Sequence, residues 1–452
     1  MNDSIFRLYD IRGTYPSQIN ERVVFSIARK LKKVFSGQGA VVIGYDARVS
    51  SYGLHTALRE GLSRANIAYY DIGFCSTPMV VYFVHTLKSA GGIMVTASHN
   101  PKEYNGLKFF DARGMGIGGT NIKKQLGRIQ PEKYNETAQK TNLGKSKYHQ
   151  QYAHFLKRFI SVNRPLKVVI DTSNGSTGPI WEILARTMRK QGVTCIILNK
   201  KCDGVFSAHG PNPLISSAHQ DTKDAIKKHH ADMGVIIDGD GDRAVFLDEQ
   251  GNVVSAGHIW RLLAAYKKIK KSVVSVVNAF HVNVFKKTLT HPVYITASPV
   301  GHVFLRSLMR KTKSDIGIEG SGHYYFSSFF YSDSAVMAAL SVINALSRLP
   351  YALSRYVDML PGVYQIPEQT VTASKNHLKR IYKLLLAYGR KNAYKVSDSD
   401  GISLTSDNAW CNVRYANTES VARVNIAGVN MSVCKVLKND IRSMAKRVHV
   451  LH

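Results

Sequence analysis

Short apolar runs alternate with amphipathic stretches along most of the chain, at the spacing expected for repeated strand and helix units. Residues 40–45 form a continuous apolar run typical of a buried strand, and residues 52–62 carry apolar positions at helical spacing. A second cycle begins at 166–171 and a third at 251–254. The three segments have similar lengths, so the pattern predicts one α/β fold used three times, with mixed or parallel sheets.

The later elements follow the same alternation up to Leu349 and Pro350, after which the pattern changes. Helices are predicted at 180–191, 218–230 and 260–268, and strands at 193–198, 235–237, 272–277 and 293–296. In the last part of the chain, strand-like runs at 403–404, 410–414 and 421–426 accompany helical stretches at 376–391 and 433–448. This grouping is typical of a separate α+β domain.

These changes of pattern divide the chain into four predicted domains. The polar, lysine-rich loop 131–147 gives the first boundary. A chain of 452 residues is too long for one ordinary hydrophobic core, which agrees with this division. The predicted domains span residues 1–146, 147–247, 248–356 and 357–452.

Composition excludes several classes of protein. The chain is 44% hydrophobic and 20% charged, as in globular proteins. No apolar run approaches the ~20 residues that cross a bilayer, and the N-terminus lacks the features of a signal peptide. The five scattered cysteines have no paired spacing and are expected to be free thiols in a reducing compartment. The sequence therefore predicts a cytoplasmic protein with no membrane partner.

The formal net charge of +30 is the one unusual global value. A basic surface attracts phosphate backbones, which makes nucleic acid an alternative partner. The lysines are spread over many segments, however, and no nucleic-acid-binding motif accompanies them. We therefore expect no physiological nucleic-acid partner, and an inactive basic binding or scaffold protein is the non-enzymatic alternative.

A serine in a tight polar loop is the first candidate for chemistry. The hexapeptide 96–101, Thr-Ala-Ser-His-Asn-Pro, follows the apolar run 92–95, and its proline makes the turn abrupt. Ser98 can be held rigidly there, but its hydroxyl needs a base, a metal or an activated substrate to act as a nucleophile. His99 is adjacent, and adjacent side chains usually diverge, so a Ser-His-Asp hydrolase is not expected. Taken alone, Ser98 is most simply explained as a turn residue.

Three aspartates on alternate residues, Asp238, Asp240 and Asp242, follow the strand-like run 235–237. The glycines between them allow a loop that wraps all three around one cation, and hard oxygen ligands suit Mg²⁺. An EF-hand is excluded because Arg243 stands at the position that requires glycine. A solvated acidic turn is the simpler alternative. Together with the serine, the aspartates indicate phosphoryl transfer beside a divalent metal.

Ordered motifs across nearly the whole chain resemble those of the α-D-phosphohexomutases, specifically the bacterial phosphomannomutase/phosphoglucomutase branch. They are residues 6–13 (Phe-Arg-Leu-Tyr-Asp-Ile-Arg-Gly), 96–101, 105–108 (Asn-Gly-Leu-Lys), 209–214 (His-Gly-Pro-Asn-Pro-Leu), 238–243, 300–302 (Val-Gly-His), 319–323 (Glu-Gly-Ser-Gly-His) and 414–419 (Arg-Tyr-Ala-Asn-Thr-Glu). The resemblance implies four domains around a central cleft. Three would be similar mixed α/β domains, and the fourth a C-terminal α+β domain of the TATA-box-binding-protein-like type.

The resemblance also implies a reaction. Ser98 would be a phosphoserine, and one Mg²⁺ would be held by Asp238, Asp240, Asp242 and an oxygen at Ser98. A hexose 1-phosphate would accept the phosphoryl group, giving a hexose 1,6-bisphosphate that turns over in the cleft and leaves as hexose 6-phosphate. The expected sugar is mannose, with glucose as a further substrate. A phosphoglucosamine mutase and a metal-dependent sugar phosphatase are the alternatives, and a monomer or homodimer is expected.

Roles for individual side chains follow from the matched motifs. Arg12, Lys108 and Arg243 would supply positive charge around the transferring group, and Lys108 and His323 are candidates for general base and acid. Ser98 and His99 complete the catalytic set. The residues assigned to substrate binding are His302, Glu319, Ser321, His323, Arg414, Asn417 and Thr418. Glu319 and Ser321 would bind sugar hydroxyls, and the last three residues the non-reacting phosphate.

The chain departs from the family pattern at three positions. Gly320 stands where related enzymes often carry methionine, which is expected to loosen one wall of the sugar site. Ala416 replaces a frequent serine, and the lost hydroxyl removes a phosphate hydrogen bond worth ~1–3 kcal/mol. Ser420 replaces a frequent proline. Asn417, followed by threonine, favours the hexose mutases over the phosphoglucosamine branch, where glycine commonly occupies that position.

Overall fold

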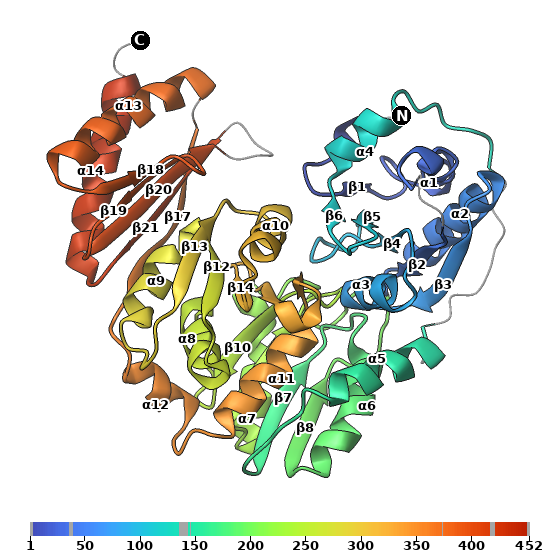
Figure 1. The fold of residues 1–452 in the computed structure, drawn as a ribbon, viewed down its shortest axis with the longest axis horizontal. Helices are drawn as coiled ribbons and strands as arrows, with labels where there is room; N and C mark the ends of the chain where they lie inside the picture. The colour runs from blue at the N-terminus through green and yellow to red at the C-terminus, as the bar shows by residue number, and fades with distance from the viewer. Residues whose placement is uncertain are drawn as a thin grey trace.

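The structure, a computed structural model, describes residues 3–35, 39–134, 143–144, 146–372, 374–415 and 421–449. Four β-sheets follow one another along the chain around an arc (Figure 1), with the first sheet, in blue, and the last, in red, at its two ends. Three of the sheets are mixed and the fourth is antiparallel. The fold class predicted from the sequence is thereby confirmed.

The first sheet has six strands. Its elements are β1 (Ile11–Thr14), α1 (Glu21–Ala28), β2 (Val41–Tyr45), α2 (Ser51–Arg64), β3 (Tyr69–Phe74), α3 (Thr77–Thr86), β4 (Gly91–Val95), β5 (Tyr104–Asp111), β6 (Gly116–Ile117) and α4 (Gly119–Leu126). The strand order is β1-β5-β4-β2-β3, with β6 beside β5. Strands β2 and β4 are buried along their whole length, which explains their uninterrupted apolar sequences.

The second sheet carries the aspartate loop. Its elements are α5 (Lys147–Lys157), β7 (Leu166–Asp171), α6 (Gly178–Arg189), β8 (Val193–Leu198), α7 (Gln220–His229), β9 (Met233–Ile237), β10 (Ala244–Asp248) and β11 (Val253–Val254). The strand order is β11-β10-β9-β7-β8. Strands β9 and β10 form an antiparallel hairpin, so the loop 238–243 is a tight connection at one edge of this sheet.

The third sheet repeats the design of the first two. Its elements are α8 (Ala256–Lys267), β12 (Lys271–Ser275), α9 (Val276–Lys286), β13 (Tyr294–Ser298), α10 (His302–Thr312), β14 (Ile316–Ile318), β15 (Tyr324–Phe326), β16 (Ser332–Asp333), α11 (Ala335–Leu346) and α12 (Leu353–Asp358). The predicted strand 272–277 is too long, because α9 begins at Val276. The side chain of this valine is buried in the core. The valine run favours a strand locally, but packing of the helix on β12 overrides that preference.

In each of these three sheets one central strand has two parallel neighbours, followed by two antiparallel strands. Strands β2, β7 and β12 occupy the central position. The first antiparallel strands are β5, β10 and β15, and the next are β1, β11 and β16. The prediction of one fold used three times is confirmed, while the domain boundaries given above stay predictions.

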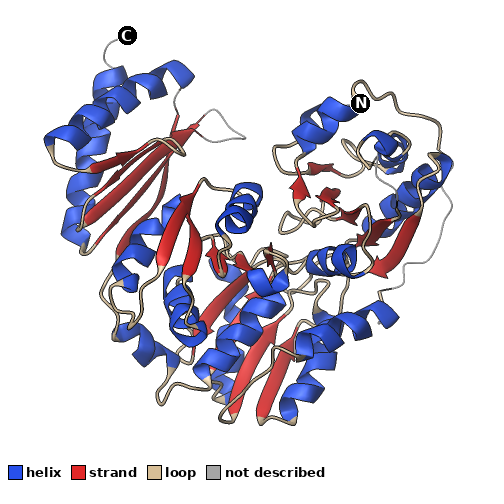
Figure 2. Cartoon of the chain, in the orientation of Figure 1, coloured by secondary structure: helices blue, strands red, loops and turns tan. Residues whose placement is uncertain are grey.

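The fourth sheet is wholly antiparallel, in the order β17-β21-β20-β19-β18. Its elements are β17 (Tyr364–Thr372), α13 (Lys375–Lys391), β18 (Lys395–Ser397), β19 (Ile402–Thr405), β20 (Ala409–Tyr415), β21 (Val421–Gly428) and α14 (Met431–His449). Helices α13 and α14 lie together on one face of the sheet (Figure 2). On the other face, Trp410 and Ala427 contact Phe280 of α9.

The hydrophobic core connects the first three sheets. One cluster extends from Val42 and Phe110 through Trp181 and Phe246 to α11, which is buried along its whole length. The C-terminal sheet has a core of its own with α13 and α14. Four short 3-10 helices complete the described elements: η1 (Asp3–Ile5), η2 (Leu31–Lys33), η3 (Ser216–His219) and η4 (Ser327–Phe329).

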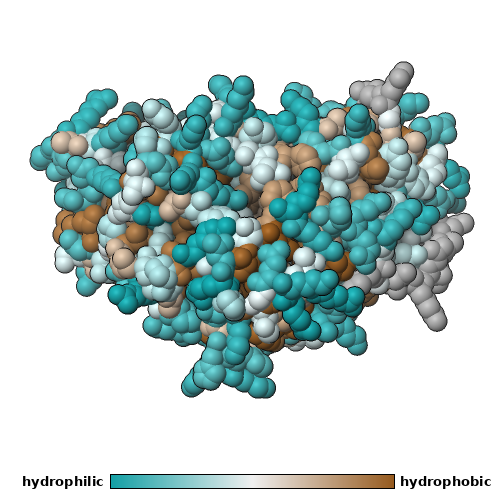
Figure 3. Space-filling model, turned by 60° about the horizontal axis from the view of Figure 1, so that its bottom comes forward, coloured by the Kyte–Doolittle hydropathy of each residue, from teal (hydrophilic) through white to brown (hydrophobic). Residues whose placement is uncertain are grey.

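Figure 3 shows one face on which hydrophilic side chains predominate and apolar residues show between them. Among the described residues, no helix is both long enough and apolar enough to cross a bilayer. The five cysteines are free thiols, as the sequence predicts.

Candidate active site

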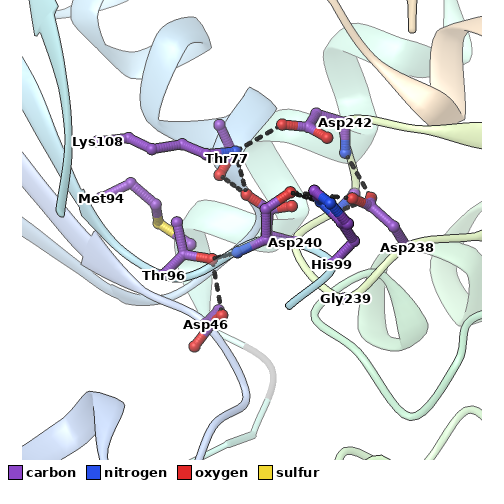
Figure 4. A network of polar contacts seen from close by, with 12 residues as sticks. Asp46, Thr77, Met94, Thr96, His99, Lys108, Asp238, Gly239, Asp240 and Asp242 are labelled. Atoms are coloured by element: carbon purple, nitrogen blue, oxygen red, sulfur yellow. Dashed lines mark hydrogen bonds and ion pairs between the residues drawn. The ribbon is translucent and has the colours of Figure 1, made fainter. Parts of the chain in front are cut away.

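Three buried carboxylates lie at the tip of the β9–β10 hairpin (Figure 4). Asp238, Asp240 and Asp242 are at most 4% exposed, and one carboxylate oxygen of each lies within 4.8 Å of the others. The backbone N–H groups of residues 241–243 donate to Asp238 Oδ1 at 3.0 to 3.1 Å. Gly241 has a φ of 82°, a conformation that favours glycine. Gly241 thus permits the turn by which the loop folds around the Asp238 carboxylate.

Two donors from the N-terminal part of the chain reach these carboxylates. Thr77 Oγ1 donates to Asp240 Oδ2 at 2.5 Å, and Lys108 Nζ lies 2.7 Å from the same oxygen and 2.6 Å from Asp242 Oδ2. Burial opposes the charge on Lys108, but the two carboxylates outweigh burial and raise the pKa of the ammonium above its ordinary value. Thr77 is a site residue that sequence reasoning missed, since nothing near it in the sequence marks it.

The three carboxylates have unequal surroundings. Burial, and then the negative charges of Asp242 and Asp240, raise the pKa of Asp238 well above its usual range. Burial also disfavours the charged form of Asp242, but Lys108, followed by His323, outweighs it and holds the pKa of Asp242 well below its usual range. Burial and mutual repulsion thus disfavour a third negative charge in the cluster, and a cation bound among the carboxylates would relieve this.

The donor set at this position fits a hard divalent cation. The Oδ1 atom of Asp240 is buried without a hydrogen-bond partner, which is costly unless a cation binds it, and Asp242 Oδ1 has only ion-pair contacts of 3.4 Å and longer. Carboxylate oxygens are the ligands that Mg²⁺ prefers in proteins. The three aspartates form a candidate metal site whose ion would be held by oxygen atoms alone.

Ser98 lies beside this carboxylate cluster, in the loop between β4 and β5. Its Oγ is 3.2 Å from Asp238 Oδ2 and 3.3 Å from His99 Nδ1. The expectation that the adjacent serine and histidine side chains diverge is wrong. Ser98 has a φ of 54°, a left-handed conformation uncommon for serine, which brings the two side chains together.

His99 nevertheless lacks the properties of a hydrolase base. Burial, followed by the positive charges of Arg243 and Arg12, lowers the pKa of His99 to about 2. An imidazole with so low a pKa is neutral near pH 7 and accepts a proton poorly. The contact between Ser98 and His99 therefore orients the serine loop more than it activates the hydroxyl.

A fully buried arginine that sequence reasoning missed holds the serine loop in place. Arg48 donates from its two terminal nitrogens to four carbonyl groups between residues 98 and 104, at 2.6 to 2.9 Å. Its Nε lies 3.1 Å from Asp46 Oδ2, and both side chains are 0% exposed. Asp46 also accepts from Thr96 Oγ1 at 2.8 Å (Figure 4). The short Asp-x-Arg sequence after β2 gives no signal that it supports a loop so far along the chain.

Arg12 of β1 approaches the same loop from the other side. Its Nη1 donates to Asn100 Oδ1 at 2.6 Å, its Nη2 contacts Asp10, and its Nε is buried without a partner. The structure brings all the predicted catalytic residues to one cavity of about 440 Å³. Its lining includes Arg12, Ser98, His99, Lys108, Arg243, His302 and His323.

The predicted sugar loop lies beside the aspartate loop. Arg243 and His323 form an isolated antiparallel β-bridge, which joins the second sheet to the third. The Nε2 atom of His323 is 3.4 Å from Asp242 Oδ1, and Ser321 Oγ is 2.9 Å from His323 Nδ1. Glu319 accepts from the Gly301 N–H at 2.9 Å and from the Tyr325 hydroxyl at 2.6 Å. These contacts fix the loop before any sugar binds.

His302, the first residue of α10, is partly buried between the first and third sheets and lines the same cavity. Burial, followed by the charges of His323 and Lys108, lowers the pKa of His302 well below its usual range. Tyr9 packs against it with ring centroids 5.2 Å apart and donates to the Val300 carbonyl at 2.9 Å. The imidazole is therefore neutral near pH 7 and held by contacts from a distant part of the chain.

Asn278 lies directly beside Gly320, the position expected to loosen the sugar site, and that expectation stays a prediction. The Gly320 N–H donates to Asn278 Oδ1 at 2.6 Å, and a Cβ at this position would lie 2.9 Å from Asn278 Nδ2. The asparagine side chain from α9 fills the space beside the glycine. A neighbour from another element, which the local sequence does not reveal, forms this wall.

A second cavity, of about 480 Å³, continues from the sugar loop to the C-terminal sheet. Its lining includes Asn278, Glu319, Ser321, Glu368, Arg414, Arg423 and Asn425. Arg414 is 8% exposed, and its Nε is buried without a partner. The predicted phosphate contacts Asn417 and Thr418 lie outside the described residues, as do the departures at Ala416 and Ser420. Sequence reasoning missed Glu368 and Arg423, which stand outside the recognisable motifs.

Comparison with known proteins identifies the family. Three domain families match in order, each described as phosphoglucomutase/phosphomannomutase, alpha/beta/alpha domain: domain I over residues 3–135, domain II over 147–251 and domain III over 257–364. A phosphomannomutase from Escherichia coli K12 is 31% identical over 435 residues, covering 93% of this chain and 94% of the relative. The chain belongs to the phosphoglucomutase/phosphomannomutase family. A Xanthomonas campestris relative named for phosphohexose mutases is 30% identical, with the same coverage.

Solved structures of family members share the fold. A phosphoglucomutase/phosphomannomutase family protein from Burkholderia thailandensis superposes with a TM-score of 0.84 at 24% identity, covering 99% of this chain and 98% of that one. Parafusin, a phosphoglucomutase from Paramecium, superposes with a TM-score of 0.75 at 17% identity, covering 98% and 95%. The architecture is therefore common to family members whose sequences have diverged widely.

Proposed function

We propose that this chain is a Mg²⁺-dependent phosphomannomutase of the cytoplasm, which interconverts mannose 1-phosphate and mannose 6-phosphate and also accepts glucose phosphates. The observation that carries the proposal is the 3.2 Å contact between Ser98 Oγ and Asp238, at the candidate metal site. The Escherichia coli and Xanthomonas relatives, named for hexose phosphate mutases, support the reaction class. A mannose substrate is supported by the name of the first of them.

The reaction would use Ser98 as a phosphoserine. The 6-hydroxyl of a hexose 1-phosphate attacks phosphorus, the new O–P bond forms as the bond to Ser98 Oγ breaks, and the hydroxyl proton ends on Oγ. The product is a hexose 1,6-bisphosphate. After the bisphosphate turns over in the cleft, Ser98 Oγ attacks the phosphorus on O1, and its proton passes to O1. Hexose 6-phosphate then leaves and the phosphoserine is restored.

The chain's own charges suit this transfer. Bound to Asp238, Asp240 and Asp242, Mg²⁺ would supply positive charge that neutralises the phosphoryl oxygens. Arg12 and Arg243, which line the same cavity, add charge in fixed positions, where it costs no reorganisation during the reaction. Lys108, with its raised pKa, keeps its proton and adds a further fixed positive charge beside the two carboxylates. His323 is then the candidate for the base that takes the sugar hydroxyl proton.

Substrate recognition would extend along the two cavities. Glu319 and Ser321 would hold sugar hydroxyls that glucose and mannose share, with His302 closing the site from the side of the first sheet. Arg414 would bind the phosphate that does not react, since a guanidinium can donate two parallel hydrogen bonds to phosphate oxygens. We expect Asn417 and Thr418 to contribute to the same phosphate site.

A coupled mutase assay tests the proposal. Mannose 1-phosphate, glucose 1-phosphate and glucosamine 1-phosphate are compared in the presence of Mg²⁺ and a trace of hexose 1,6-bisphosphate. We expect conversion of the first two to 6-phosphates, with loss of at least about four powers of ten in rate for Ser98→Ala, because the variant has no group to carry the phosphoryl. Ser63→Ala, an exposed serine of α2, is the matched control and should keep full activity.

The other outcomes are equally informative. Conversion of glucosamine 1-phosphate alone would keep the mutase class and overturn the choice of sugar. Release of inorganic phosphate without isomerisation would favour a sugar phosphatase. Full activity of Ser98→Ala would overturn the phosphoserine mechanism.

A further inference from the structure

Helix α10 lies on the side of the third sheet that faces the first sheet (Figure 1). Its residues 302, 306 and 310 are spaced by four and therefore share one face of the helix. His302 lines the active-site cavity, and Arg310 Nη2 donates to the Arg113 carbonyl at 2.8 Å. Arg306 stands between them and donates from Nη2 to the Gly114 carbonyl. This face therefore runs from the active-site cavity onto the turn between β5 and β6.

Arg306 is a cation buried against the first sheet. The residue is 1% exposed, and its guanidinium carbon lies 5.9 Å from the centroid of the Phe110 ring. Burial opposes its charge and lowers its pKa, while the negative charge of Asp333 partly compensates. An apolar side chain would fill this position without that desolvation cost, but it has no donor for the Gly114 carbonyl. The contact with the turn is therefore the property that an arginine supplies here.

Helix α3 encloses the same turn from the other side. Gly114 has a φ of 68°, and a Cβ at this position would lie 2.9 Å from His85 Nε2. The His85 ring stacks on Phe330, between β15 and β16, with centroids 4.0 Å apart and an interplanar angle of 12°. Within the turn, Asp111 Oδ1 accepts from the Met115 N–H at 2.8 Å. A shift of the turn relative to α10 therefore disturbs contacts on both of its sides.

The turn is continuous with the strand that carries Lys108, which lies three residues before the end of β5. In the sheet register Lys108 is paired with Met94 of β4, and Gly106 of the same strand with Arg12 of β1. Strand β4 leads directly into the loop of Ser98. Holding the turn therefore holds the strands on which the residues assigned to phosphoryl transfer lie.

At its other end, α10 is joined to the loop assigned to sugar recognition. The Gly301 N–H, directly before the helix, donates to Glu319 Oε1 at 2.9 Å. Glu319 is 4% exposed and also accepts from the Tyr325 hydroxyl, so this carboxylate is fixed within the third sheet. One helix of 11 residues thus connects the sugar loop to the strand that carries Lys108.

We propose that Arg306 is a positioning residue, which through the Gly114 carbonyl sets the distance between the serine side of the active-site cavity and the sugar loop. The inference rests on the proposed function and adds to it a residue outside the lining of both cavities. Reacting groups must be closely aligned, and a displacement of about 1 Å costs up to about 100-fold in rate. The sugar contacts assigned to Glu319 and Ser321 lie within one loop and stay intact. Arg306 therefore acts on kcat and leaves KM nearly unchanged.

Steady-state kinetics with mannose 1-phosphate test this assignment. We expect Arg306→Met to lower kcat about 10- to 100-fold while KM changes by less than about threefold. Arg306→Lys keeps a charged donor and should recover kcat to within about fivefold of wild type. Arg261→Met is the matched control, because Arg261 Nη2 also donates to a carbonyl, that of Thr288 at 2.8 Å, but joins α8 to the segment after α9. It should lower Tm and keep kcat within about twofold of wild type.

A change on the opposite side of the contact separates position from charge. Gly114→Ala leaves every charge in place, but its Cβ would meet His85 and displace the turn. We expect kcat to fall about 10-fold, again with little change in KM. Gly127→Ala is the control, since Gly127 has a similar φ of 65° and no described atom lies within 4 Å of a Cβ there. In the double variant of Gly114→Ala with Arg306→Met the two losses should not multiply, because both act through one contact.

Hydrogen exchange on peptides spanning 104–117 tests the contact without relying on turnover. Protection should fall at least about tenfold in Arg306→Met and change by less than about threefold in Arg261→Met. If Arg306→Met does not fold, Gly114→Ala and Arg306→Lys decide the question in its place.

Three results would overturn part of this reasoning. Wild-type kcat in Arg306→Met or Gly114→Ala, with protection lost, would show that the contact is merely structural. Unchanged protection in Arg306→Met would show that the turn does not depend on this arginine. Loss of protection in a protein that isomerises no sugar phosphate would refute the proposed function, while the contact between α10 and the turn would stand.

Discussion

Removal of the Arg48 guanidinium should loosen the serine loop far more than an ordinary charge substitution does. In Arg48→Met the four carbonyl groups between residues 98 and 104 lose their donor, and Asp46 stays buried with its main counter-charge gone. The hydroxyls of Thr96 and Ser51 still donate to that carboxylate, so the buried charge of Asp46 keeps part of its stabilisation. Removing one partner of a buried ion pair typically costs about 3 to 5 kcal/mol.

Hydrogen exchange measured by mass spectrometry on peptides spanning 91–111 would report this loss of stability in the serine loop itself. A local measurement is preferable because a four-domain chain does not unfold in a single two-state step. A loss of about 3 to 5 kcal/mol corresponds to a fall in protection of roughly two to four powers of ten. Mutase activity should fall with it, because Ser98 loses the carbonyl contact that fixes its backbone.

Matched substitutions make the result interpretable. Arg64→Met removes a surface arginine whose ion pair with Glu60 is exposed, and it should change protection of the same peptides by less than twofold. The double variant Asp46→Asn with Arg48→Met removes both charges and should recover part of the loss. Protection in Arg48→Met within about threefold of wild type would refute the reasoning that this buried pair holds the loop.

Two further predictions concern the metal site and the acid side of the pH range. Mg²⁺ at about 100 times its Kd should stabilise the wild-type protein by about 2.7 kcal/mol, measured as a rise in Tm. It should not stabilise Asp240→Asn, and an equal rise of Tm in this variant would contradict the assigned ligands. Asp224→Asn, an exposed acid of α7, is the control. Burial, followed by His258, lowers the pKa of His281 to about 4. Below about pH 6.5 the unfolded chain therefore binds more protons at this histidine than the folded chain does, and the free energy of unfolding falls as the pH falls. Between pH 7.5 and 5 this histidine should lower the free energy of unfolding by about 2 kcal/mol. His281→Gln should reduce the pH dependence of Tm, whereas the exposed His154→Gln should not. Identical pH profiles for wild type and His281→Gln would argue against the burial effect.

The local sequence was sufficient to predict the positions of candidate site residues that directly follow a strand. Ser98 and the three aspartates follow apolar runs that become the buried strands β4 and β9, so their placement at sheet edges could be predicted. Arg48 and Thr77 could not be predicted, because their partners Ser98 and Asp240 lie 50 and 163 residues away. The close contact of Ser98 with His99 depends on one left-handed residue, which the sequence does not specify.

Secondary structure escaped prediction where tertiary packing decides it. Strand β17 was not predicted, because Pro367 interrupts its pattern and sits at the bulge that places Glu368. Helix α11 is buried on all sides and has no polar face to mark it in the sequence, since the sheets and neighbouring helices surround it. In both cases the distant neighbour, and not the segment's own pattern, determines the outcome.

The repeated design of the first three sheets has a consequence for how this protein can diversify. The connections between β4 and β5, β9 and β10, and β14 and β15 are equivalent turns in three copies of one architecture. One copy carries the serine, the next the aspartates, and the third the loop 319–323. Under the proposed function each copy has a separate task, so the repeated design yields a division of labour. Changes in the third turn would then alter the preferred sugar while the two turns assigned to the chemistry stay intact.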